Sequence, residues 1–170
     1  MFVSLSTPKA TSQAIRRAYD TGWKPKMIIP SIVAQIQGTL APAGLDKAVG
    51  VMTPTFIKDA QDPRWANDPD TIAFVDWMKT YDTQVTDTAL AIAGYDSAYT
   101  LAEVLRQCGD ELTRENIIKH ASNLTKVHPP MMLPGISVTT TPTDYRVIHQ
   151  MQFQAFNGKN WELYGAVVSE

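Results

Sequence analysis

A run of residues with helical periodicity, from Asp87 to Cys108, constrains the fold of this chain more than any other feature. Small and apolar residues recur in it every three or four positions, which is the spacing of one helix face. They are Leu90, Gly94, Ala98, Leu101, Leu105 and Cys108. Thr86 or Asp87 can cap the start of this helix, and Gly109 can end it. We therefore expect a helix roughly 30 Å long, with the polar face that carries Asp96 in water.

The length and composition of the chain fit one globular domain with a sizeable core. It has 170 residues, of which 44% are hydrophobic and 19% are charged, a mixture typical of folded proteins. The net charge of −2 and the lack of a Lys/Arg cluster argue against a nucleic-acid partner, which requires a basic patch. No stretch approaches the roughly 18 consecutive apolar residues of a membrane-spanning helix. No signal peptide is visible, and the first residues already resemble a strand, so we expect the chain to be a fragment.

The first third of the chain predicts alternating strands and helices. Strands are expected at residues 2–5, 27–29 and 48–53, with helices at 8–21 and 33–40 between them. Thr7 followed by Pro8 is a strong signal for the start of the first helix. This order is typical of an α/β unit with a parallel sheet. Such sheets bind ligands at the carboxyl ends of their strands, which here are the loops at 6–8, 30–32 and 53–55.

The rest of the chain predicts three helices and then a hairpin. Asp70 is expected to cap a helix that reaches Tyr81, and Thr113 to cap one beyond the long helix. Prolines at positions 129, 130, 134 and 142 exclude long helices from there on. Residues 148–156 alternate, with Met151, Phe153 and Ala155 on the apolar side. Asn157-Gly158 then predicts a two-residue hairpin turn.

No combination of residues in this sequence indicates an enzyme. His120, His128 and His149 are far apart, without a Cys or carboxylate at metal-ligand spacing, so we expect no metal site. The motifs of serine hydrolases and of nucleotide-binding loops are absent, and we expect no cofactor. Cys108, the single cysteine, is expected to be a buried thiol, although it could pair with a cysteine outside the chain.

Two hydroxyl residues favour a binding role instead. Thr7 and Ser31 both lie at predicted strand-to-helix turns, where free backbone N–H groups and the helix dipole attract an anion. A hydroxyl at such a turn could donate to a ligand carboxylate. Both residues could equally be ordinary helix caps.

Taken together, these segments resemble the second half of the type I periplasmic solute-binding proteins of the branched-chain amino-acid ABC-transporter class. The resemblance occupies nearly all 170 residues, in the order found in the family. The matching stretches are TPKATSQAIRRAYDTGWKPK, PAGLDKAVGVMTPTFIKDAQDPRW, AIAGYDSAYTLAEVLRQCGDELTRENI and LPGISVTTTPTDYRVIHQMQFQAFNGKNWELYG.

The resemblance implies a fold of two α/β lobes joined by three crossing strands, with the ligand held between them. Residues 1–82 would belong to the second lobe, and the helices in 83–128 would return to the first. Residues 129–170 would form a crossover and the terminal hairpin of the second lobe. The resemblance also implies a periplasmic location and a membrane permease as partner, with most of the first lobe and the signal peptide missing. The missing lobe would leave apolar surface on the long helix, and self-association would follow.

The resemblance further implies which residues contact the ligand. Amino-acid binders of this family place an acidic side chain after a second-lobe strand, where this chain has Ser31. An aromatic residue of the family is replaced here at Thr7 and Pro8, while Ile32 and Val33 would give the site an apolar wall. Tyr95 is a further candidate, for which packing between elements is the alternative. We therefore expect binding of a small apolar or aromatic carboxylate, or an amino acid, for import. A ligand-sensing regulatory domain of the same fold, or a fragment that self-associates without binding ligand, are the alternatives.

Overall fold

The computed structural model describes residues 1–81 and 88–170 and divides into two compact units. Unit 1 comprises Met1–Thr55 and Gln152–Ala166, and unit 2 comprises Phe56–Met151 and Val167–Glu170. The chain therefore passes from one unit to the other three times. The lobe assignment expected for residues 1–82, 83–128 and 129–170 refers to a longer protein and stays a prediction.

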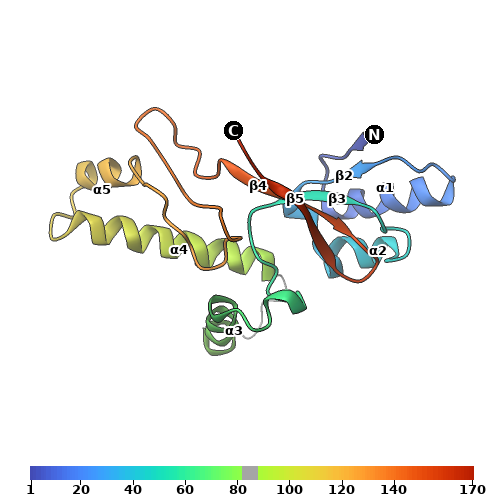
Figure 1. The fold of residues 1–170 in the computed structure, drawn as a ribbon, viewed down its shortest axis with the longest axis horizontal. Coiled ribbons are helices and arrows are strands. Elements are labelled where there is room, and N and C mark those ends of the chain that lie inside the picture. Colours follow the sequence, from blue (N-terminus) through green and yellow to red (C-terminus); the bar gives the residue numbers. More distant parts are fainter. Residues whose placement is uncertain (82–87) are drawn as a thin grey trace. The chain divides into compact units, whose positions relative to one another are not determined.

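Unit 1 contains most of the sheet, whose strand order is β1-β2-β3-β4-β5 (Figure 1). The strands are β1 (Phe2–Val3), β2 (Met27–Ile28), β3 (Met52–Thr55), β4 (Gln150–Phe156) and β5 (Trp161–Ser169). The first three are parallel, and β4 pairs antiparallel to β3, with Met52 opposite Ala155. Helix α1 (Pro8–Asp20) connects β1 to β2. The predicted α/β class is confirmed, and the terminal hairpin joins the same sheet.

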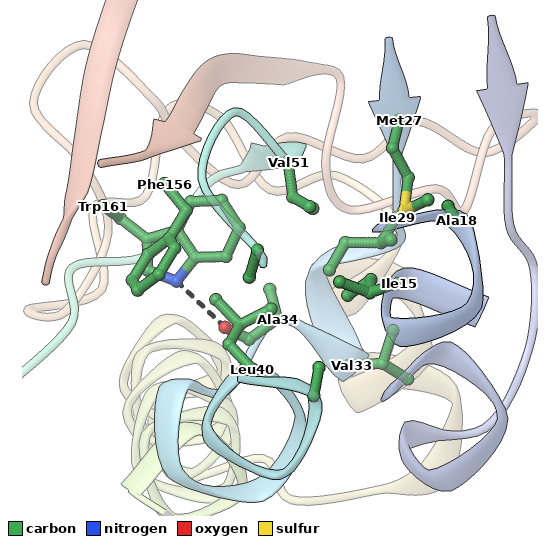
Figure 2. Close-up of a cluster of buried hydrophobic side chains, with 12 residues drawn as sticks. Ile15, Ala18, Met27, Ile29, Val33, Ala34, Leu40, Val51, Phe156 and Trp161 are labelled. Atoms are coloured by element: carbon green, nitrogen blue, oxygen red, sulfur yellow. Dashed lines mark hydrogen bonds between the residues drawn. The ribbon is translucent and has the colours of Figure 1, made fainter. Parts of the chain in front are cut away.

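The core of unit 1 packs one face of the sheet against α1 and the turns after β2 (Figure 2). Ile29 and Leu40 are almost fully buried there, together with two of the aromatic residues of the hairpin, Phe156 and Trp161. Their rings meet edge to face, with centroids 5.5 Å apart. The Trp161 indole N–H donates to the Ala34 carbonyl at 2.9 Å, so the end of the chain is fixed against the turns after β2.

Two local predictions in unit 1 need correction. The single helix expected at 33–40 is instead a 3-10 turn (Ser31–Val33), a π-helical turn (Ile36–Leu40) and the short α2 (Ala41–Ala43). Gly38 and the β-branched residues beside it are weak helix formers, and Pro42 supplies no N–H. The strand expected at 48–53 also begins later, at Met52.

The turn between β4 and β5 is longer than the sequence predicts. It contains the four residues 157–160 rather than two, because the Asn157 side-chain carbonyl accepts from the N–H groups of Lys159 and Asn160. An Asn side chain that satisfies two backbone donors stabilises the wider loop. The expected one-sided alternation of β4 is also weak, since its residues are half-buried on both faces and only Phe156 is fully buried.

Unit 2 is built from three helices and an irregular C-terminal segment. The helices are α3 (Pro69–Tyr81), α4 (Thr88–Cys108) and α5 (Arg114–Ala121), with a 3-10 turn at Pro63–Trp65. Thr113 caps α5 as predicted, accepting from the Asn116 N–H. The caps predicted for the long helix, Thr86 or Asp87, lie outside the described residues. Within the part of the chain that the structure describes, no helix follows Ala121.

The buried face of α4 differs from the predicted one. Ile92, Asp96, Val104 and Cys108 are buried, whereas Leu90 and Leu101 are more than half exposed. Asp96 was expected in water but is only 7% exposed. The predicted and the observed stripe have similar spacing and share only Cys108, so periodicity alone could not tell them apart.

Candidate functional site

The candidate site lies at the carboxyl ends of the parallel strands of unit 1. The Ser4 N–H donates to the Ile28 carbonyl at 2.9 Å, and the Ile29 N–H donates to the Met52 carbonyl at 2.9 Å. These bonds extend the pairing of β1, β2 and β3 to their carboxyl ends. Because the strands are parallel, the loops that follow β1 and β2 lie at the same edge of the sheet. Thr7, Pro8, Ser31 and Ile32 all belong to these two loops.

The loop after β1 holds a chain of three hydroxyl groups. The Ser6 hydroxyl lies 2.7 Å from that of Ser4 and 2.9 Å from that of Thr11. Ser4 and Thr11 are buried, so the loop is fixed from beneath by polar contacts. We did not single out these residues from the sequence, although three hydroxyl residues flanking the Thr7-Pro8 helix start were a visible signal.

Thr7 occupies the N-cap position of α1 but does not use its side chain as a cap. Its backbone is extended, with φ −69° and ψ 161°, and its hydroxyl forms no capping hydrogen bond. Pro8 is the first helical residue, as predicted. Both side chains are exposed. The Thr7 hydroxyl is therefore available to donate to a ligand at this edge.

The three predicted residues after β2 lie in different surroundings. Ser31 is half-buried and begins the 3-10 turn, for which Pro30 is the N-cap. A turn of three residues supplies little dipole, so the anion-binding argument from helix structure does not hold at Ser31. The Ile32 side chain is 66% exposed, whereas Val33 is 5% exposed and belongs to the core (Figure 2). The Gln35 amide N–H donates to the Ile32 carbonyl at 2.6 Å, which holds the turn.

Tyr95 belongs to unit 2, in an aromatic cluster on α3 and α4. Its ring centroid is 5.3 Å from that of Phe74 and 5.3 Å from that of Trp77. Trp77 in turn packs on Tyr81. Tyr95 is half-buried among these rings. These contacts agree with the alternative role of Tyr95, which is packing between elements. That Tyr95 also contacts a ligand stays a prediction.

Lys58 and Asp96 are buried ionisable groups of unit 2. The Lys58 ammonium is 2.7 Å from the Asp68 carboxylate and 3.5 Å from that of Asp70. Asp96 accepts from the Met131 N–H at 3.1 Å through Oδ1, while its buried Oδ2 has no hydrogen-bond partner among residues 1–81 and 88–170. Burial raises the pKa of Asp96 to about 6.

Lys58 and Asp96 both contact the backbone of Met131. The Lys58 backbone N–H donates to the Met131 carbonyl at 2.7 Å, and the Asp96 carboxylate accepts from the Met131 N–H. Asp68 also accepts from the Thr71 N–H at 2.9 Å and thus caps α3. The cap predicted at Asp70 is therefore wrong by two residues.

Neither a metal site nor a membrane-spanning helix is found among the described residues. Residues 1–81 and 88–170 contain no group of three His, Cys, Asp or Glu side chains placed to hold a metal ion. Among the same residues, no helix is long and apolar enough to cross a membrane.

Comparisons with known proteins agree on one family. Residues 1–160 match the model of the family described as periplasmic binding protein. No curated protein sequence matches the chain. The family and the solved structures below are solute-binding proteins rather than enzymes, in agreement with the predicted absence of catalysis.

Solved structures of branched-chain amino-acid binding proteins share the fold at low sequence identity. A branched-chain amino-acid ABC transporter protein from Thermus thermophilus with bound valine has 13% identity and a TM-score of 0.79 over 99% of this chain. The leucine-binding protein LivK from Thermotoga maritima has 15% identity and a TM-score of 0.67 over 98% of it. LivJ from Streptococcus pneumoniae, in complex with isoleucine, has 11% identity and a TM-score of 0.66 over 99% of it. This chain covers 45%, 44% and 44% of those three proteins, which is less than half of each.

Proposed function

We propose that this chain, which belongs to the periplasmic binding protein family, supplies part of the ligand site of a substrate-binding protein that serves an ABC importer. The solved relatives that bind valine or isoleucine support a small-molecule ligand. The proposed site is the edge formed by the loops after β1 and β2. The proposed location is the periplasm, and the proposed membrane partner is the permease of the importer.

The ligand class follows from the residues at this edge. No Asp or Glu occurs in residues 30–34, so this loop offers no carboxylate to pair with a ligand ammonium. Removing an ammonium from water without such a partner is costly. The exposed Ile32 side chain instead presents apolar surface at the same edge of the sheet as Thr7. We propose that the ligand is a small apolar or aromatic carboxylate, or an amino acid whose ammonium is paired elsewhere.

The observation that carries this proposal is that one edge of a parallel sheet holds both an exposed apolar side chain, Ile32, and an exposed hydroxyl that makes no capping hydrogen bond, that of Thr7. Such an edge is where α/β folds bind ligands. The hydroxyl donates to a ligand oxygen, and Ile32 contacts the hydrocarbon part. Ser31 contributes the second hydroxyl, and Val33 supports the turn from the core.

Introducing the missing carboxylate tests the ligand class. Ser31→Asp places an acidic group where a ligand ammonium would lie, so affinity for leucine should rise relative to 4-methylpentanoate, which lacks the ammonium. Thermal shift and calorimetric titration of the chain with both compounds measure this ratio. Gln37→Asp is the matched control, because Gln37 is exposed, lies beyond the loop after β2 and receives the same charge change.

Comparing the two variants distinguishes a carboxylate in the ligand site from a general effect of added negative charge. A ratio that changes in Ser31→Asp but not in Gln37→Asp supports the site after β2. Equal responses in the two variants, or none in either, would contradict it. We do not propose the ligand-sensing alternative, because no described contact favours it.

A further inference from the structure

The two units carry opposite net charges, which the net charge of the whole chain conceals. Unit 1 has seven Lys/Arg and three Asp/Glu residues, a net charge of +4. Unit 2 has eight Lys/Arg and fourteen Asp/Glu residues, a net charge of −6. Charge separated in this way is a physical signal for an interaction surface rather than for the fold itself.

Much of the positive charge of unit 1 is concentrated where α1 turns into β2. Arg17, Tyr19, Trp23, Lys24 and Lys26 are all exposed there, and we call these five residues the α1-end patch. Both aromatic side chains are 53% exposed. Figure 1 shows this turn between the C-terminal end of α1 and the start of β2.

Trp23 is held by contacts with its neighbours, and the cations of the patch form no ion pair with a carboxylate of the described residues. The Trp23 N–H donates to the Ala18 carbonyl at 2.9 Å, and the Trp23 ring packs edge-on against Phe2 at 5.5 Å. Asp20 is the only acidic residue among residues 1–45, and it is paired with Lys47 at 2.6 Å. Within residues 1–81 and 88–170, no carboxylate forms an ion pair with Arg17, Lys24 or Lys26.

The mixture of residues indicates the kind of partner. Exposed Trp and Tyr side chains have an apolar body and a polar tip, which suits the boundary between a membrane and water. Lys and Arg beside them are attracted to the anionic headgroups of that boundary. An acidic protein could also use both the cations and the rings, since Trp and Tyr are common in protein interfaces, and it is therefore the alternative that the experiment must distinguish. We propose that the α1-end patch binds the surface of an anionic phospholipid membrane.

Co-sedimentation of the full chain with lipid vesicles tests this proposal. Phosphatidylcholine vesicles that contain phosphatidylglycerol should bind the chain, and pure phosphatidylcholine vesicles should not. Binding should weaken in high salt, because headgroup attraction is screened. Each Lys or Arg at an anionic surface raises partitioning about fivefold, so Lys24→Glu/Lys26→Glu should lower the partition coefficient at least about 25-fold. Trp23→Ala should also lower it.

A matched charge change elsewhere controls for the net charge of the chain. Arg114→Glu/Lys119→Glu alters two exposed residues of α5 by the same amount and should leave vesicle binding nearly unchanged. The proposal is wrong if both double variants bind alike, or if pure phosphatidylcholine vesicles bind as well. It is also wrong if soluble polyglutamate displaces the chain and Trp23→Ala binds normally, because the patch would then recognise an acidic protein.

Discussion

Asp96 is a buried carboxyl group whose only hydrogen-bond donor among the described residues is the Met131 N–H. Its second oxygen gains nothing from ionisation, and burial penalises the charge, which raises its pKa to about 6. The nearby Lys58 ammonium offsets this penalty in part. The Met131 hydrogen bond favours the ionised form, but the cost of burying the charge is larger, so the folded chain is most stable when Asp96 is protonated.

Asp96 should make the stability of the chain depend on pH. The folded chain binds this proton more tightly than the unfolded chain, in which the pKa is near 3.8. This contribution to the free energy of unfolding is fully present below about pH 4. It is lost as the pH rises to about 6, and the loss is about 3 kcal/mol. Urea unfolding of the wild type and of Asp96→Asn at pH 4.5 and 7.5 isolates this contribution. Identical pH dependence in the two proteins would contradict the burial argument.

Asp68 and Asp70 share the Lys58 ammonium but should differ in importance. Asp68 lies closer to Lys58 and also accepts from the Thr71 N–H and hydroxyl, both at 2.9 Å. Asp70 is 3.5 Å away and more than half exposed. Asp68→Asn should cost about 1–2 kcal/mol, whereas Asp70→Asn should cost about 0.5 kcal/mol or less. Chemical denaturation measures both, and a larger loss in Asp70→Asn would refute the assignment of Asp68 as the cap.

Among the elements, α4 shows most clearly what the sequence could and could not predict. The helical spacing of its small and apolar residues predicts its length, and Gly109 predicts its end at Cys108. Its buried face does not, because Ile92 and Val104 compete with an equally regular stripe that includes Leu101. Only the packing partners decide between them, and these come from distant segments such as Phe74 and Met131.

Single truncations on the two sides of α4 should therefore differ in their effect. Ile92 is 1% exposed and Leu101 is 54% exposed. Ile92→Ala should lower the free energy of unfolding by about 2–4 kcal/mol, and Leu101→Ala by about 0.5 kcal/mol or less. Urea titration of the two variants gives the comparison. Equal losses would mean that the helix is packed by its other face.

The candidate site shows a similar division between predictable and unpredictable features. The two loops follow from the order of strands and helices, since strand ends in a parallel sheet share an edge. The orientation of single side chains does not follow. Val33 and Ile32 are neighbours of similar chemistry, yet one is in the core and the other in solvent. That difference arises because residues 31–33 form a 3-10 turn after Pro30 instead of joining a regular helix.

At the scale of the whole molecule, the exposed apolar side chains of α4 should promote self-association. Leu101 is 54% exposed and Leu105, one turn on, is 37% exposed. Contiguous apolar surface of this kind is usually covered in folded proteins. Light scattering after size exclusion should show dimers that increase with concentration in the wild type and decrease in Leu101→Ala/Leu105→Ala. Elution of the wild type as a monomer at all concentrations would exclude this prediction.

The measurement that tests the account most directly is an NMR titration of the chain with leucine and with 4-methylpentanoate. The amides of Thr7, Ser31 and Ile32 should shift on addition of at least one of these compounds, even if binding is weak. Residues of α5, far along the chain and in the other unit, should not respond. Shifts confined to the loops after β1 and β2 would support the proposed ligand site. Unchanged spectra at saturating ligand, or shifts only in unit 2, would contradict it.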